Sequence, residues 1–268
     1  MKALYHILLS LLLACLCTGI AAASTSDPSS TAPPIANAES GATMAQAYAS
    51  YEAGNVAWSR AWSASDIALI RQHLGEAKAA FTTCLNTANQ VNDPANAANL
   101  ALMKSVSTAY IALADAALAM YDGADVYSAG RGQMNAGQYA AAAASFQSAG
   151  DTFQRAQTLF GQATATLQGV SYAGTSFGDG SAYTAAIVPI LNNKGIYSGE
   201  FADYARGWQH TSLAYQASAS GDTITFRTEA TQAMAHFGIL RTSATFGADA
   251  TGNYDVLAGL LSRRSNLR

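Results

Sequence analysis

Residues 138–169 read QYAAAAASFQSAGDTFQRAQTLFGQATATLQG. A large apolar residue recurs every seven positions in this stretch, and alanine recurs every seven positions between them. The two series are Tyr139, Phe146, Phe153, Phe160 and Leu167, and Ala142, Ala149, Ala156 and Ala163. Alternating steps of three and four residues predict one helix, roughly 45 Å long, that packs along its length against other helices.

The same alternation of steps occurs through most of the chain after residue 43. It predicts helices over residues 44–62, 67–91, 94–135, 197–215 and 226–244, and we expect a short terminal helix around 253–266. Asp66, Asp93 and Asp222 mark helix starts, with Pro94 at a first helical position. No segment alternates apolar and polar residues over the length of a strand. We therefore expect an all-α fold, an antiparallel bundle of six or seven long helices with heptad-like seams.

The first 23 residues resemble an export signal. One lysine precedes an apolar run from Leu4, and Ala21 and Ala23 form an A-x-A cleavage site. Two alternatives stay open: lipidation of Cys15 in the lipobox-like LLAC, or an uncleaved anchor, because the run approaches the ~20 residues that span a bilayer. Residues 24–43 are rich in Ser, Thr, Pro and Ala, and we expect a disordered spacer there.

The rest of the chain divides into three predicted segments. Residues 44–169 form the main helical bundle, and residues 170–180 form a mobile connector rich in glycine. Residues 181–268 form an additional helical layer, whose first helix is expected to bend at Pro189.

Part of the chain resembles tetratricopeptide repeats. The resemblance rests on 137–149, through Gly137, Tyr139, Ala142, Phe146 and Ala149, and on 74–84, through Ala77, Phe81 and Cys84. That family is a solenoid of helical hairpins repeating at about 34 residues, and the resemblance implies protein or peptide binding. The seven-residue ladder produces the same spacing and continues to Leu167, so the sequence favours a bundle of long helices.

GTSFG, residues 174–178, matches the G-x-S-x-G pattern of a serine nucleophile, here Ser176. Asp203 and either His210 or His236 follow in hydrolase order. The pattern requires a strand before the serine, whereas the sequence predicts the end of a long helix. We therefore expect a connector without catalytic residues.

Aromatic residues form the best candidate interaction surface. They lie at helical spacing in one stripe, Tyr197, Phe201, Tyr204, Trp208 and Tyr215. Core packing explains such a stripe, and so does a groove for a ligand, peptide or glycan. An earlier helix carries a similar set, Tyr48, Tyr51, Trp58 and Trp62.

The composition argues against several function classes. The net charge is −3 with no Lys/Arg run, so nucleic acid is not an expected partner. Paired Glu-x-x-His motifs and C-x-x-C-H are absent from the sequence, and we expect no metal and no cofactor. His73, His210 and His236 neighbour seam positions and are expected to be solvated or flanking, while Cys84 is expected to be a core residue.

These features predict an extracytoplasmic protein, secreted or at the cell surface. We expect a non-enzymatic binding or scaffold protein whose partner is a protein or cell-envelope component, with self-association as the simplest form. Membrane contact is expected only through an uncleaved signal or a lipidated Cys15. The alternative is a helical bundle that binds a small molecule or cofactor, as a carrier or sensor, and a serine hydrolase using Ser176 ranks third.

Overall fold

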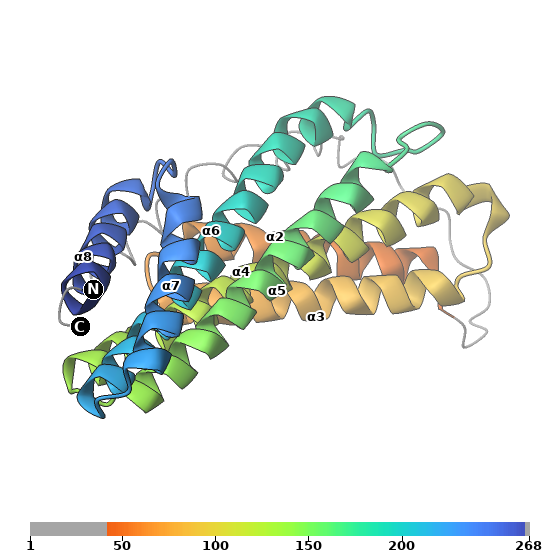
Figure 1. The fold of residues 1–268 in the computed structure, drawn as a ribbon. Helices are drawn as coiled ribbons and strands as arrows, with labels where there is room; N and C mark the ends of the chain where they lie inside the picture. Colours follow the sequence, from red (N-terminus) through yellow and green to blue (C-terminus); the bar gives the residue numbers. More distant parts are fainter. Residues whose placement is uncertain (1–41, 266–268) are drawn as a thin grey trace. The chain divides into compact units, whose positions relative to one another are not determined.

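The computed structural model describes residues 42–265, so the predicted signal peptide, Cys15 and the spacer up to residue 41 lie outside it. The described chain forms seven α-helices that pack antiparallel in sequence order (Figure 1). They are α2 (Met44–Ser63), α3 (Ile67–Gln90), α4 (Ala97–Asn135), α5 (Tyr139–Gln168), α6 (Ser181–Ala219), α7 (Thr223–Leu240) and α8 (Gly247–Ser265), with a 3-10 turn, η1 (Pro94–Asn96), before α4. No strand occurs between residues 42 and 265. The predicted all-α antiparallel bundle is confirmed.

Helix starts follow the predicted capping chemistry. The side chains of Asp66, Asp93 and Asp222 each accept hydrogen bonds from two backbone N–H groups of the following turn. Gly137 and Gly221 follow the ends of α4 and α6, with φ of 73° and 77°. This left-handed backbone conformation favours glycine, and it reverses the chain within a short turn.

Two helices extend beyond their predicted limits. α6 is a single helix of 39 residues that continues through Pro189, a residue with no backbone N–H to donate. α8 begins at Gly247 rather than at residue 253. The hydroxyl of Ser243 accepts hydrogen bonds from the N–H groups of Thr245 and Phe246, which caps the turn that leads into α8.

The chain separates into two compact units. Among the described residues, unit I comprises 42–118 and 159–193, and unit II comprises 119–158 and 194–265. Because α4, α5 and α6 contribute to both units, each unit contains residues of the predicted main bundle, 44–169, and of the predicted additional layer, 181–268.

The core of unit I lies between α2, α3 and the first part of α4. One buried cluster contains Ala47, Cys84, Ala88, Leu100 and Met103. Further along α2, the ring of Trp58 meets that of Tyr110 edge-on, with 4.9 Å between centroids. α2 approaches α3 closely at Gly54, where a Cβ atom would lie 2.8 Å from the Phe81 ring.

The core of unit II is rich in aromatic residues. Phe146 and Phe153, from the ladder that predicts α5, are fully buried. Their rings pack on α4 at glycines, and a Cβ at Gly130 or Gly123 would lie 3.0 or 2.7 Å from them. Large residues on α5 therefore fit against positions of α4 that have no side chain.

One described helix, Pro94–Asn135 with η1 included, is long and apolar enough to cross a membrane. Its most apolar window has a mean hydropathy of 1.2, and 56% of that window is buried within the protein. α4 contributes to the cores of both units, and a helix that is buried on several faces is apolar on those faces.

Candidate functional site

The aromatic stripe predicted as an interaction surface lies on α6 within unit II. Phe201 and Tyr204 are buried, with 3% and 8% of their surface exposed, while Tyr197, Trp208 and Tyr215 are half-buried. Only these last three side chains present part of their surface to the outside. The use of the stripe for binding stays a prediction.

The contacts of the stripe are mostly with other aromatic rings. Tyr204 stacks on Phe246 with 4.7 Å between centroids, and the loop before α8 supplies Phe246. Trp208 packs against Phe237 of α7, and the guanidinium of Arg131 lies 4.1 Å from its ring centre. The indole Nε1 of Trp208 is buried and has no hydrogen-bond partner among the described residues. The stripe is thus largely a structural element of unit II.

A second arrangement on α6 joins it to α7 through two histidines. The Nδ1 of His210 donates a hydrogen bond to Glu229 Oε2 at 2.7 Å. The Nδ1 of His236 donates to Asp203 Oδ1 at 3.1 Å. The two imidazole rings are stacked, with 5.6 Å between centroids and 9° between planes. Each helix supplies one acid and one histidine, and each acid binds the histidine of the other helix.

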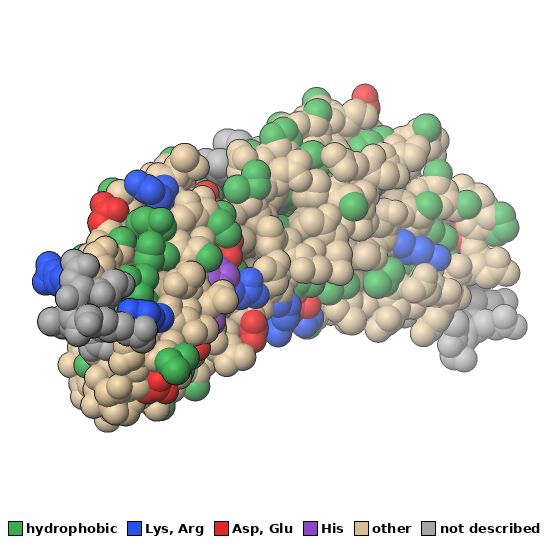
Figure 2. Space-filling model, viewed as in Figure 1, with side chains coloured by type: hydrophobic (Ala, Val, Ile, Leu, Met, Phe, Trp, Pro, Cys, Tyr) green, Lys and Arg blue, Asp and Glu red, His purple; other side chains and the backbone are tan. Residues whose placement is uncertain are grey.

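These four side chains lie at a close approach of the two helices. A Cβ at Gly207 of α6 would lie 2.6 Å from the Phe237 ring of α7. The four polar side chains keep between 20% and 28% of their surface exposed. Histidine is visible on the face shown in Figure 2, next to charged side chains. Partial burial strengthens such contacts, because solvent screens them less.

The chemistry open to the histidine pair follows from its geometry. An ionised carboxylate only accepts, so each pairing fixes a proton on Nδ1 and leaves Nε2 as the free nitrogen. Because the rings are parallel, their in-plane Nε2 lone pairs do not converge on one point, and chelation of a single ion is disfavoured. Residues 42–265 also contain no group of three His, Cys, Asp or Glu side chains able to hold a metal. The arrangement fixes the register of α6 against α7.

The seam pattern of the sequence does not predict this arrangement, although a signal for it is present in the spacing of the four residues. Asp203 precedes His210 by seven residues, and Glu229 precedes His236 by seven residues in the next helix. In antiparallel neighbours, two equal acid-to-histidine spacings bring each acid opposite the other histidine. His73, the other histidine among residues 42–265, bonds Glu76 on its own helix, with 2.8 Å between Nδ1 and Oε2.

Ser176 lies in the connector between α5 and α6, after a helix rather than a strand. Its backbone N–H donates to the side-chain oxygen of Asn99 at 2.8 Å. Phe177, the next residue, packs on the rings of Tyr48 and Tyr51, with centroids 5.9 and 5.8 Å away. The strand-to-helix turn of a nucleophile elbow is therefore not the local structure here.

Cys84 is fully buried in the core of unit I, as the sequence predicts. Burial raises the pKa of its thiol. A buried neutral thiol behaves as a small apolar side chain.

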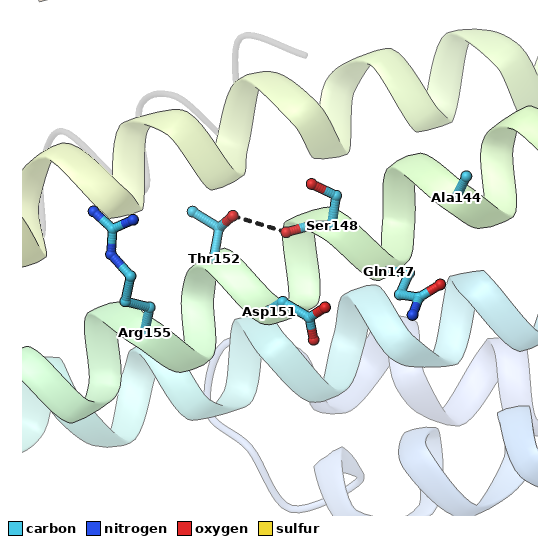
Figure 3. Close-up of a pocket in the computed structure, with 6 residues that line it drawn as sticks. All are labelled: Ala144, Gln147, Ser148, Asp151, Thr152 and Arg155. Atoms are coloured by element: carbon cyan, nitrogen blue, oxygen red, sulfur yellow. Dashed lines mark hydrogen bonds between the residues drawn. The ribbon is translucent and has the colours of Figure 1, made fainter.

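A shallow, open depression lies on the outer side of α5 within unit II (Figure 3). It is lined by Ala144, Gln147, Ser148, Asp151, Thr152 and Arg155. All six belong to one helix, and Arg155 and Asp151 point to opposite sides of it. The Thr152 hydroxyl donates to the Ser148 carbonyl at 2.8 Å. The lining comes from one helix, unlike that of a ligand pocket enclosed by several elements.

No family model, no curated protein and no solved structure matches this chain. The resemblance of 137–149 and 74–84 to tetratricopeptide repeats therefore rests on those residues alone.

Proposed function

We propose that this protein is an exported, non-enzymatic binding or scaffold protein whose partner is a macromolecule of the cell envelope or a second copy of itself. The observation that carries the proposal is a set of exposed aliphatic side chains on the last two helices. Ile224 and Ile239 on α7 are 78% and 65% exposed, and Val256 on α8 is 58% exposed. Figure 2 shows hydrophobic side chains gathered over this part of unit II. Exposed apolar groups of this kind gain free energy when a partner covers them.

The polar part of the helix surface supports the same proposal. Many Ser and Thr hydroxyls donate to a carbonyl one turn earlier in their own helix, as Thr158, Thr166, Thr231 and Ser262 do. A hydroxyl that donates its proton to a helix carbonyl does not donate it to water. With only 12% of the chain charged, these faces cost little to desolvate in an interface.

The N-terminal sequence supports a location outside the cytoplasm. A leader with an A-x-A site, followed by a spacer rich in Ser, Thr and Pro, is typical of a folded module delivered beyond the membrane. Half-buried Tyr197, Trp208 and Tyr215 add aromatic area that suits an interface, because Tyr and Trp have few rotamers to freeze.

Affinity capture from envelope extracts tests the proposal. Immobilised protein should retain a partner, or itself, and Ile239→Ser should weaken retention. Leu69→Ser is the matched control, because Leu69 is also an exposed aliphatic residue but lies on α3 in unit I. Equal retention by both variants, together with a stoichiometric small molecule in native mass spectra, would instead support the carrier alternative. Labelling by a fluorophosphonate that Ser176→Ala abolishes would support a hydrolase.

A further inference from the structure

The outward face of α8 has a sequence that is complementary to itself. α8 contacts α7, and its buried face includes Ala250 and Leu257. A second face carries Asp249, Gly252, Val256, Leu260 and Arg263. Successive α-helical residues turn by about 100°, so these five fall within about 40° of Val256 and form one stripe along the helix. Asp249, Gly252, Val256 and Arg263 are exposed and Leu260 is half-buried.

Val256 is the centre of this stripe. Asp249 and Arg263 lie seven residues before and after it, and Gly252 and Leu260 lie four residues before and after it. An acid therefore lies as many residues before Val256 as a base lies after it. In the same way, a glycine lies as many residues before Val256 as a leucine lies after it. The two ends of the stripe carry opposite charges, and its middle is apolar.

We propose that α8 pairs with α8 of a second copy of this chain, antiparallel, about a two-fold axis at Val256. This inference rests on the proposed binding function and names its partner. In such a pair, a residue before Val256 faces the residue equally far after it in the other copy. Asp249 then meets Arg263 of the second copy, and Leu260 meets Gly252 of the second copy, each twice because of the symmetry. A leucine opposite a glycine allows two helices to pack closely, as a knob in a hole.

The complementarity selects the antiparallel arrangement. In a parallel pair in register, Asp249 would face Asp249 and Arg263 would face Arg263, and like charges would repel. α8 has 19 residues, about 28 Å, so a single helix pair buries a small interface, at the weak end of specific complexes. The expected dimer is therefore reversible and weak.

Sedimentation equilibrium of the purified protein with charge-reversal variants tests this arrangement. The wild type should dimerise. Asp249→Arg should weaken the dimer about tenfold, because two attractions become two repulsions. Arg263→Asp should do the same, and the double variant Asp249→Arg/Arg263→Asp should restore the affinity because the pairs re-form with their charges exchanged. Asp255→Arg is the matched control, since Asp255 is exposed on α8 but points about 100° away from Val256, the centre of the stripe.

Circular dichroism of each variant verifies that α8 and the rest of the fold persist. Weakening by both single variants, rescue by the double variant and no effect of Asp255→Arg support the antiparallel pair. A dimer whose affinity neither single variant changes, or one that the double variant weakens further, overturns it while leaving self-association at another face. A monomer at every concentration also overturns it, and envelope capture then decides separately whether the proposed binding function stands.

Discussion

His210 and His236 lie with their imidazole rings stacked, 5.6 Å between centroids and 9° between planes, although they belong to different helices. Each ring is oriented by a carboxylate of the opposite helix, Glu229 for His210 and Asp203 for His236. The four side chains form two crossed bonds, and both bonds depend on one register of α6 against α7. A shift of one helix by a single turn would break both bonds.

The crossed bonds predict energetic coupling between α6 and α7. In a double-mutant cycle of His236→Ala and Asp203→Ala, we expect a coupling free energy of about 0.5–3 kcal/mol, because both side chains are partly buried and in contact. Urea unfolding of the four proteins measures it. The matched control is His73 with Glu76, a more exposed pair within one helix, whose coupling should be smaller. Equal coupling in the two cycles would contradict a role in helix register.

Glycines of α4 that receive rings of α5 should not tolerate a methyl group. Gly123→Ala should destabilise unit II by about 1–3 kcal/mol, because a Cβ would lie 2.7 Å from the Phe153 ring. Phe153→Ala should cost about 3–5 kcal/mol by leaving a cavity. Gly161→Ala, in the interior of α5 with no atom near its Cβ, should instead stabilise by up to ~1 kcal/mol. Denaturant melts compare the three, and a Gly123→Ala protein as stable as Gly161→Ala would rule out this packing.

The burial of this ladder could be predicted from sequence, because one helix carries the whole pattern. Phe146, Phe153 and their alanine neighbours are buried where the seven-residue spacing places them. Core packing of Tyr204 is also an interpretation that the spacing of the α6 stripe allows, but the spacing does not identify the residues that cover this side chain. Its cover includes Phe246, from a loop outside every seam, and no local pattern says which loop folds over a stripe.

The histidine pairs show the same limit. Each histidine neighbours a seam position, and its partner lies on another helix at a register that one helix alone does not reveal. The glycines of the connector predict mobility, which stays a prediction; its contacts with α2 and α4, through Phe177 and Ser176, are not visible in its composition. Each of these contacts joins residues that are far apart in the sequence, and composition does not predict such contacts.

The connector should resist proteolysis until its anchors are removed. We expect slow cleavage between residues 169 and 180 in the native protein, and cleavage roughly tenfold faster in Phe177→Ala, if the lost packing lowers the opening free energy by about 1.4 kcal/mol. The turn at Ser220 and Gly221, exposed and in the other unit, should be cleaved at an unchanged rate. Limited proteolysis with mass spectrometry measures both sites. Rapid cleavage of the wild-type connector would show that these anchors do not hold it.

Alkali should destabilise the protein through its buried tyrosines. Burial raises the pKa of Tyr110 and of Tyr127 well above the ordinary value of 10.0, and the neighbouring hydroxyls of Tyr183 and Tyr204 contribute to this increase. Above pH 10.0 the unfolded chain loses these protons and the folded chain keeps them, so stability falls as pH rises. Unfolding melts as a function of pH should show this decline. It should be smaller in Tyr127→Phe, and an identical decline in that variant would contradict the assignment.

The proposed function is tested most directly by cross-linking in the intact cells that produce the protein, followed by purification and mass spectrometry. Our account predicts cross-links from α7 or α8 to a second copy or to an envelope component outside the cytoplasm, and their loss in Ile239→Ser. Recovery of cytoplasmic, uncross-linked protein that carries a stoichiometric small molecule would contradict it.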